Sequence, residues 1–198
     1  MTTSLQTEEL QGVTILRITS QDGTNRLTSE FVLTLTEAIA ELSKEPRGLV
    51  ITGSDTFFSA GADLEEIARL CGPASYEFAR MGQQLMGEVA EFPAPVYAAI
   101  SGYCMGGGLD LALACHHRIA SLNSVFGHRG AALGLITGWG GTQRLQPLIG
   151  KGRALEMFVA AEKVTAVRAL RIGLVDAISE DPIEECMRRI LEPMRDRD

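Results

Sequence analysis

The chain has 198 residues, of which 45% are hydrophobic and 22% charged, and its 25 acidic and 18 basic side chains give a net charge of −7. This balance is typical of a folded chain and argues against disorder, while the acidic excess argues against a nucleic-acid partner, which needs clustered positive charge. No apolar run approaches the roughly 18 residues that a membrane span needs, so no membrane partner is expected.

Residues 1–9 have neither the basic start nor the apolar stretch of a secretory signal. The four cysteines are far apart, without a CxxC pair or a histidine at metal-finger spacing. These features predict free thiols, no metal site and a cytoplasmic protein. The length suits one domain and no linker-like segment interrupts it, so we predict a single domain over residues 1–198.

In the first half of the chain, residues 12–19 alternate like a half-buried strand. Thr28 is expected to cap a helix with Phe31, Leu35 and Ile39 on one stripe, which stops before Pro46. The segments that follow are a short strand at 49–52, a loop at 53–61, a polar-faced stretch at 62–70, a helix ending at 92–93 and a buried strand at 96–100.

In the second half, residues 109–115 are apolar almost all round and predict an interior helix. Gly173 is expected to close one later helix, and Asp181 followed by Pro182 to open the last one. The other predicted elements are strands at 118–121, 125–126 and 174–179, a glycine-rich loop at 127–141, and helices near 153–160 and 165–171. Strands alternate with helices, which predicts the α/β class.

Glycine is unusually frequent, with 21 residues, and two glycine-containing loops have the same layout. In each, a buried strand (49–52 or 96–100) is followed by the loop and then by a helical segment. The first N–H groups of a helix are unpaired, and glycine lets a ligand approach the backbone closely. Such loops can donate N–H groups to a carbonyl oxygen that becomes an oxyanion. The alternative for either loop alone is a tight turn without a ligand.

Other glycine motifs are excluded. The chain has no G-x-G-x-x-G dinucleotide fingerprint after a strand, no phosphate-binding G-x-x-x-x-G-K-[ST] and no G-x-S-x-G nucleophile elbow.

Five segments together resemble the crotonase (enoyl-CoA hydratase/isomerase) family in order and approximate spacing. They are Ser59-Ala-Gly-Ala-Asp-Leu64, Gly102-Tyr-Cys-Met-Gly-Gly-Gly-Leu-Asp-Leu-Ala-Leu-Ala-Cys115, Gly138-Trp-Gly-Gly-Thr-Gln-Arg-Leu145, Gly150-Lys-Gly-Arg-Ala-Leu-Glu-Met157 and Arg171-Ile-Gly-Leu-Val-Asp176. The resemblance implies a crotonase-like spiral of ββα units, here with a shortened C-terminal helical region, that assembles as a homotrimer or a dimer of trimers.

The resemblance also implies the chemistry. Family members bind acyl-CoA thioesters and stabilise an enolate-like intermediate, and coenzyme A enters as part of the substrate, so no separate cofactor is expected. The two amides of the implied oxyanion hole fall on Ala62 and Gly107. Residues implied to contact the substrate or its CoA moiety are Ala60, Asp63, Leu64, Gly106, Gly130 and Thr137.

The proton-transfer residues depart from the family pattern. One hydratase glutamate corresponds to Asp110, and the second corresponds to Gly130 within Phe126-Gly-His-Arg-Gly130. Three alternatives follow: Asp110 shuttles a proton alone; His128, with an ordinary pKa near 6.5, serves as a base; or the space left by Gly130 holds water or a small anion. The third resembles the dihydroxynaphthoyl-CoA synthases, although their accompanying aspartate falls on Thr137.

The sequence thus predicts a hydratase/isomerase-like enzyme that acts on an acyl-CoA, with Asp110 as the acid/base and isomerisation as the easier reaction for a single carboxylate. Structural roles are the alternatives for single residues, capping for Asp110 and packing for His128. One alternative for the whole chain is a non-catalytic acyl-CoA-binding or scaffolding homologue, which Gly130 and Glu65 favour. The other alternative is a thioester hydrolase or decarboxylase of the same fold.

Overall fold

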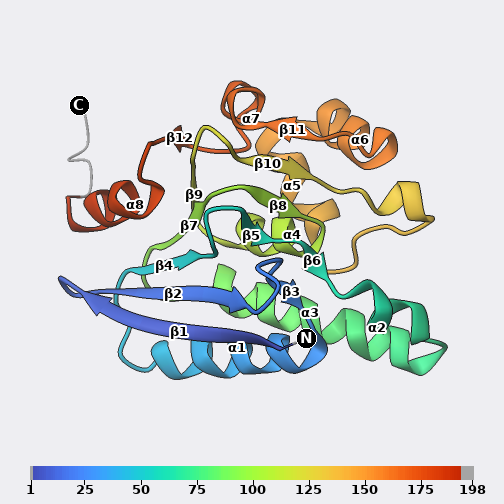
Figure 1. Ribbon diagram of the computed structural model, residues 1–198, viewed down its shortest axis with the longest axis horizontal. Coiled ribbons are helices and arrows are strands. Elements are labelled where there is room, and N and C mark those ends of the chain that lie inside the picture. The colour runs from blue at the N-terminus through green and yellow to red at the C-terminus, as the bar shows by residue number, and fades with distance from the viewer. Residues whose placement is uncertain (1, 193–198) are drawn as a thin grey trace.

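The computed structural model describes residues 2–192, which form a mixed α/β arrangement around a six-stranded sheet (Figure 1). Its strands, in spatial order, are β1 (Thr3–Leu10), β2 (Val13–Ser20), β4 (Leu49–Thr52), β7 (Val96–Ile100), β9 (His117–Ala120) and β12 (Ala177–Ile178). β1 and β2 pair antiparallel, and every further pair in this sheet is parallel. The single domain over residues 1–198 stays a prediction, and residues 1 and 193–198 lie outside the described part.

A second, four-stranded sheet lies beside the first. Its strands, in spatial order, are β11 (Val164–Thr165), β10 (Val125–Gly127), β8 (Tyr103–Met105) and β5 (Phe57–Ser59), and a separate pair is formed by β3 (Arg26–Leu27) and β6 (Gly61–Ala62). Three times a strand of the large sheet is followed by a strand of the second sheet and then by a helix, beginning at β4, β7 and β9, with the short β6 inserted before the helix in the first case. This repetition confirms the predicted spiral of ββα units.

Eight α-helices lie in the described residues, and most of them begin and end near the predicted signals. They are α1 (Ser29–Leu42), α2 (Leu64–Arg69), α3 (Pro73–Ala90), α4 (Gly107–Ala114), α5 (Gly141–Ile149), α6 (Lys151–Ala160), α7 (Ala166–Ile172) and α8 (Pro182–Leu191), with a short 3₁₀ helix η1 at Gly130–Leu133. Thr28 caps α1 and Asp181 caps α8 through their side chains, and Gly173 ends α7 in the left-handed conformation. None of the described helices is long and apolar enough to cross a bilayer.

The central strands of the large sheet are buried on both faces, because their alternate residues enter two separate apolar clusters. In β4, Leu49 and Ile51 face the larger cluster with α1 and α3, whereas Val50 faces the smaller one with Cys186 and Met187 of α8. Figure 1 shows the corresponding layers, with α8 and α1 on opposite sides of the strands. This arrangement explains why the strands are continuous apolar runs in the sequence.

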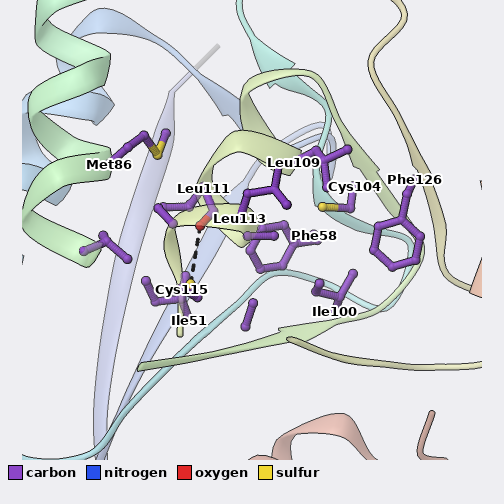
Figure 2. Packing of buried hydrophobic residues seen from close by; sticks show 14 of the residues in the cluster. Ile51, Phe58, Met86, Ile100, Cys104, Leu109, Leu111, Leu113, Cys115 and Phe126 are labelled. Carbon is purple, nitrogen blue, oxygen red and sulfur yellow. Dashed lines mark hydrogen bonds between the residues drawn. The ribbon is translucent and has the colours of Figure 1, made fainter. Parts of the chain in front are cut away.

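Helix α4 is the predicted interior helix, and every residue from 108 to 114 is buried. Figure 2 shows its Leu109, Leu111 and Leu113 among Phe58 and Phe126 of neighbouring strands. A helix that is apolar on all sides must be enclosed by other elements. Its N-terminus, which carries the triple glycine, is therefore held in place by the core.

Three sequence predictions were wrong or incomplete. Residues 3–10 were not predicted as a strand because they are mostly exposed, and β1 exists through its full-length pairing with β2. Helix α5 was missed because glycines precede it and Pro147 lies within it. The predicted strand at 174–179 is reduced to β12, since the amide of Leu174 donates to the carbonyl of Ala169 and continues the turn that ends α7.

Two glycines of α3 provide a matched test of packing. A Cβ at Gly82 would overlap the Trp139 indole, whereas a Cβ at Gly87 would meet nothing within 4 Å. We expect Gly82→Ala to lower the free energy of unfolding by about 1–3 kcal/mol through overpacking. Gly87→Ala should raise it by roughly 0.5–1 kcal/mol, because alanine favours a helix. Urea unfolding of both variants measures the two effects, and equal shifts would contradict this packing of Trp139.

Candidate active site

A cavity of about 580 Å³ lies where the two glycine loops, α2 and the segment after β10 meet. In Figure 1 this is the side that carries α2 and the yellow segment near residue 130. Nine of the ten residues predicted for the site line this cavity: Ala60, Ala62, Leu64, Gly106, Gly107, Asp110, His128, Gly130 and Thr137. The tertiary structure thus collects residues from four separate stretches of the chain around one space.

The amides of Ala62 and Gly107 come from the two glycine loops. Gly107 is the first residue of α4, so its N–H has no partner within the helix. The amides on either side of Ala62 both donate hydrogen bonds. The Gly61 amide donates to Ser59 Oγ at 3.0 Å, and the Asp63 amide donates to the Leu27 carbonyl at 3.4 Å. Since successive N–H groups of an extended segment alternate in direction, that of Ala62 points away from β3.

These two loops are in close contact. A Cβ on Gly107 would lie 3.3 Å from the amide nitrogen of Ala62, and a Cβ on Gly61 would lie 2.9 Å from the amide nitrogen of Gly107. Any side chain at either glycine would therefore enter the space between the loops. Glycine at both positions lets the loops approach this closely, and both Ala62 and Gly107 line the cavity.

Asp110 lies in the first turns of α4 and is only 1% exposed. The Thr137 hydroxyl donates to its Oδ2. Burial raises the pKa of Asp110 to about 7, although the Thr137 hydroxyl, the charge of Arg144 and the amide of Gly141 act in the opposite direction. A Cβ at Gly141 would overlap Oδ1 of Asp110, so only glycine lets α5 begin this close. A carboxyl group with a pKa near neutrality suits both acceptance and return of a proton.

His128 follows β10 and is 3% exposed. Its Nε2 lies 3.5 Å from Oδ1 of Asp110, and neither atom has a hydrogen-bond partner in the described part of the chain. The ring packs on Phe158 of α6, with 5.0 Å between ring centroids. Burial lowers the pKa of His128 to about 4, so the imidazole is neutral near pH 7.

Two of the predicted site residues make structural contacts of their own. Asp63 is not among the residues that line the cavity, and its side chain accepts hydrogen bonds from the amides of Glu65 and Glu66 and caps α2, so its contact with a CoA moiety stays a prediction. Gly130 lines the cavity, but a Cβ there would lie 2.8 Å from the carbonyl oxygen of Leu135, whose amide donates to the carbonyl of Gly130. The water or small anion expected beside Gly130 stays a prediction.

The sequence did not reveal the apolar lining of the cavity. Phe78 of α3, Trp139 before α5 and Phe158 of α6 all contribute to it, together with Met105, Leu133, Leu135 and Ile136. The Trp139 indole donates to the Phe78 carbonyl at 3.2 Å, which fixes the orientation of the ring. These residues belong to segments far apart in the sequence, and only the aromatic character of Trp139 near glycines was a local signal.

Comparison with known proteins agrees with the fold. The sequence profile of the Enoyl-CoA hydratase/isomerase family matches residues 8–197. The chain belongs to this family. Within it, the chain is 40% identical over 163 residues to the Bacillus subtilis (strain 168) protein named "Probable enoyl-CoA hydratase"; the match covers 81% of this chain and 63% of that protein. The chain thus spans less than two thirds of the length of this curated relative.

Solved structures of other proteins are also similar. Pseudomonas aeruginosa DspI superposes with a TM-score of 0.90 at 34% identity, covering 95% of this chain and 73% of DspI. The enoyl-CoA hydratase from Bacillus anthracis gives a TM-score of 0.86 at 31% identity, covering 95% of this chain and 74% of that protein.

Among residues 2–192, no group of three or more His, Cys, Asp or Glu side chains could hold a metal ion.

Proposed function

We propose that the chain is an enzyme that binds an acyl-CoA thioester in this cavity and transfers a proton at the carbon next to the thioester carbonyl. The amides of Ala62 and Gly107 hold the carbonyl oxygen, and Asp110 is the acid/base. The observation that carries the proposal is that a buried carboxyl group with a raised pKa lines the same cavity as two amides from adjoining glycine loops. Membership of the family supports the substrate class.

The physical reason is the weak acidity of a thioester Cα–H. Removal of this proton, or addition to a conjugated double bond, places negative charge on the carbonyl oxygen. Fixed amide dipoles stabilise that charge without reorganisation, and the loss of one such donor typically costs on the order of 3–4 kcal/mol in the barrier. The apolar walls, such as Trp139 and Phe158, keep water away and strengthen the effect.

The proposed reaction class is hydratase- or isomerase-like. In an isomerisation, Asp110 takes a proton from one carbon, the double bond shifts through the enolate, and the same carboxyl group returns the proton to another carbon. No separate cofactor is used, because coenzyme A is part of the substrate. The proposal includes assembly as a homotrimer or a dimer of trimers and a cytoplasmic location, for which the four free cysteines are supporting evidence.

A second candidate, binding of acyl-CoA without turnover, is favoured by one observation. The position that corresponds to the second family glutamate is Gly130, where a Cβ would lie 2.8 Å from the carbonyl oxygen of Leu135. A chain with only binding function needs no proton-transfer group, whereas the proposed enzyme requires one.

One assay separates the two candidates. We expect the chain to incorporate deuterium at C2 of short and medium saturated acyl-CoAs in D₂O, followed by mass spectrometry. We also expect loss or migration of the double bond of enoyl-CoAs, followed through the ultraviolet absorbance of the conjugated thioester. Tight binding of these CoA esters without exchange or turnover across the panel would favour the binding-only candidate and contradict the proposed enzyme.

A further inference from the structure

The indole of Trp139 forms a wall of the cavity beside the start of α4. It lines the cavity and is only 3% exposed. A Cβ on Gly107 would lie 2.6 Å from this ring and 3.3 Å from the amide nitrogen of Ala62. The ring therefore borders the space between the two amides, which is the place that the proposed function gives to the carbonyl oxygen of a thioester.

The other edge of the ring fills the space between α3 and α4. A Cβ at Gly82 of α3 would overlap the five-membered part of the indole, so the ring reaches from Gly82 to Gly107, the first residue of α4. Protein interiors are close-packed, and a ligand cannot share this volume with the ring. While Trp139 is present, the carbons next to a bound thioester cannot extend between the two helices.

Trp139 is fixed at its ring and at its backbone. Its indole N–H donates to the Phe78 carbonyl at 3.2 Å, and the Phe78 ring packs on it with 5.2 Å between ring centroids. The Arg144 guanidinium donates to the Trp139 carbonyl at 3.3 Å, and the side-chain amide of Gln83 donates to the Gly138 carbonyl at 2.8 Å. A wall held at so many points excludes a bulky ligand by steric clash instead of moving aside.

Other parts of the lining leave room for an acyl chain. Leu64, Leu133 and Ile136 also line the cavity, and their side chains are 55%, 59% and 72% exposed. The cavity is therefore open to solvent along these apolar side chains, and an unbranched chain can extend over them. Bulk far from the thioester has space, whereas bulk beside the thioester meets the Trp139 ring.

We infer that Trp139 is a specificity-determining residue that restricts the substrates to acyl-CoA thioesters without a branch near the carbonyl. This inference rests on the proposed function, because it uses the position of the thioester between the amides of Ala62 and Gly107. It adds the shape of the acyl group: straight next to the thioester, with its length much less restricted.

Two isomeric substrates test this inference in the full chain. Pentanoyl-CoA and 3-methylbutanoyl-CoA contain the same atoms and both have two C2 protons, but only the second is branched at C3. Their deuterium exchange at C2 is compared as a ratio of kcat/KM, and their dissociation constants are measured by calorimetry. The variants are Trp139→Leu, which removes the ring, and Trp139→Phe, which keeps a smaller one. Phe158→Leu is the control, since this second aromatic side chain of the cavity packs on His128.

We expect the wild-type chain to prefer pentanoyl-CoA by about 30-fold or more, within the range that one additional methyl group gives in a fixed apolar pocket. Trp139→Leu should reduce this preference to below about 5-fold, with an intermediate value for Trp139→Phe, because the methyl group then enters the vacated space. Phe158→Leu should keep the wild-type preference. The Trp139→Phe value decides the matter if Trp139→Leu does not fold.

Three results would overturn the inference and leave the proposed function intact: equal use of the two isomers by the wild-type chain, an unchanged preference in the Trp139 variants, or an equal fall in Phe158→Leu. A chain that exchanges neither thioester overturns the proposed enzyme. The ratio of the two dissociation constants then decides whether Trp139 selects the acyl group, since steric exclusion acts on binding as well as on turnover.

Discussion

Asp110→Asn is expected to lower the rate of C2 proton exchange and of enoyl-CoA turnover by about 100- to 10,000-fold, because the variant loses its acid/base group. The wild-type rate should rise with pH and level off above about 7, since the pKa of Asp110 is raised to about 7 and the base must be ionised. The groups that face this carboxyl group are Thr137, His128, Arg144 and the Gly141 amide. Initial rates between pH 5 and 9 test both statements.

The same substitution is expected to stabilise the fold. An unfolded aspartate titrates near 3.9, so between about pH 4 and 7 the folded chain keeps a proton on Asp110 that the unfolded chain releases. The unfolding free energy contributed by this group therefore falls as the pH rises through that window. Asparagine avoids the buried charge, and the variant should gain a few kcal/mol over wild type at pH 8, on the order of 2–4, and little at pH 4.

A matched control is Asp181→Asn at the start of α8, where Oδ1 accepts from two backbone amides and asparagine can do the same. It should leave the turnover rate unchanged, because Asp181 does not line the cavity. Full activity of Asp110→Asn would remove this residue from the mechanism. A lower free energy of unfolding of Asp110→Asn than of wild type at pH 8 would contradict the statement that the buried charge of Asp110 destabilises the fold.

Gly107→Ala is expected to lower the turnover rate by about 100- to 1,000-fold, the usual effect of losing one oxyanion donor. The added Cβ would lie 2.6 Å from the Trp139 ring and 3.3 Å from the amide nitrogen of Ala62. It would thus occupy the space that the thioester oxygen needs between the two amides. Alanine favours a helix more than glycine does, so the loss cannot come from a weaker α4.

Two glycines of α3 supply the controls for this variant. Gly82→Ala would push the same Trp139 ring without placing a methyl group near the amides, and Gly87→Ala would touch nothing within 4 Å. Turnover by all three variants is compared at substrate saturation, together with unfolding midpoints. An equal loss of turnover in Gly82→Ala and Gly107→Ala would assign the effect to displacement of Trp139 and contradict the role of the two amides.

Local sequence signals predicted the parts of the fold that depend on neighbouring residues. Thr28, Asp181 and Gly173 marked helix ends because capping is a contact within one turn. The segment at 109–115, which is apolar almost all round, predicted an interior helix for a similar reason. Its own composition requires that it be buried. By contrast, β1 is a strand through its pairing with β2, and its exposed side chains carry little signal.

The same distinction between local sequence signals and tertiary packing holds for the candidate site. The two glycine loops could be predicted from the sequence, because backbone access is a property of short segments, whereas Asp110 was implied by the resemblance to the crotonase family. Only the tertiary structure brought Nε2 of His128 to 3.5 Å from Oδ1 of Asp110, placed the Leu135 carbonyl beside Gly130 and made Asp63 the cap of α2. These outcomes depend on how distant segments pack, since packing decides which polar atoms lose water and which remain free to bind a ligand.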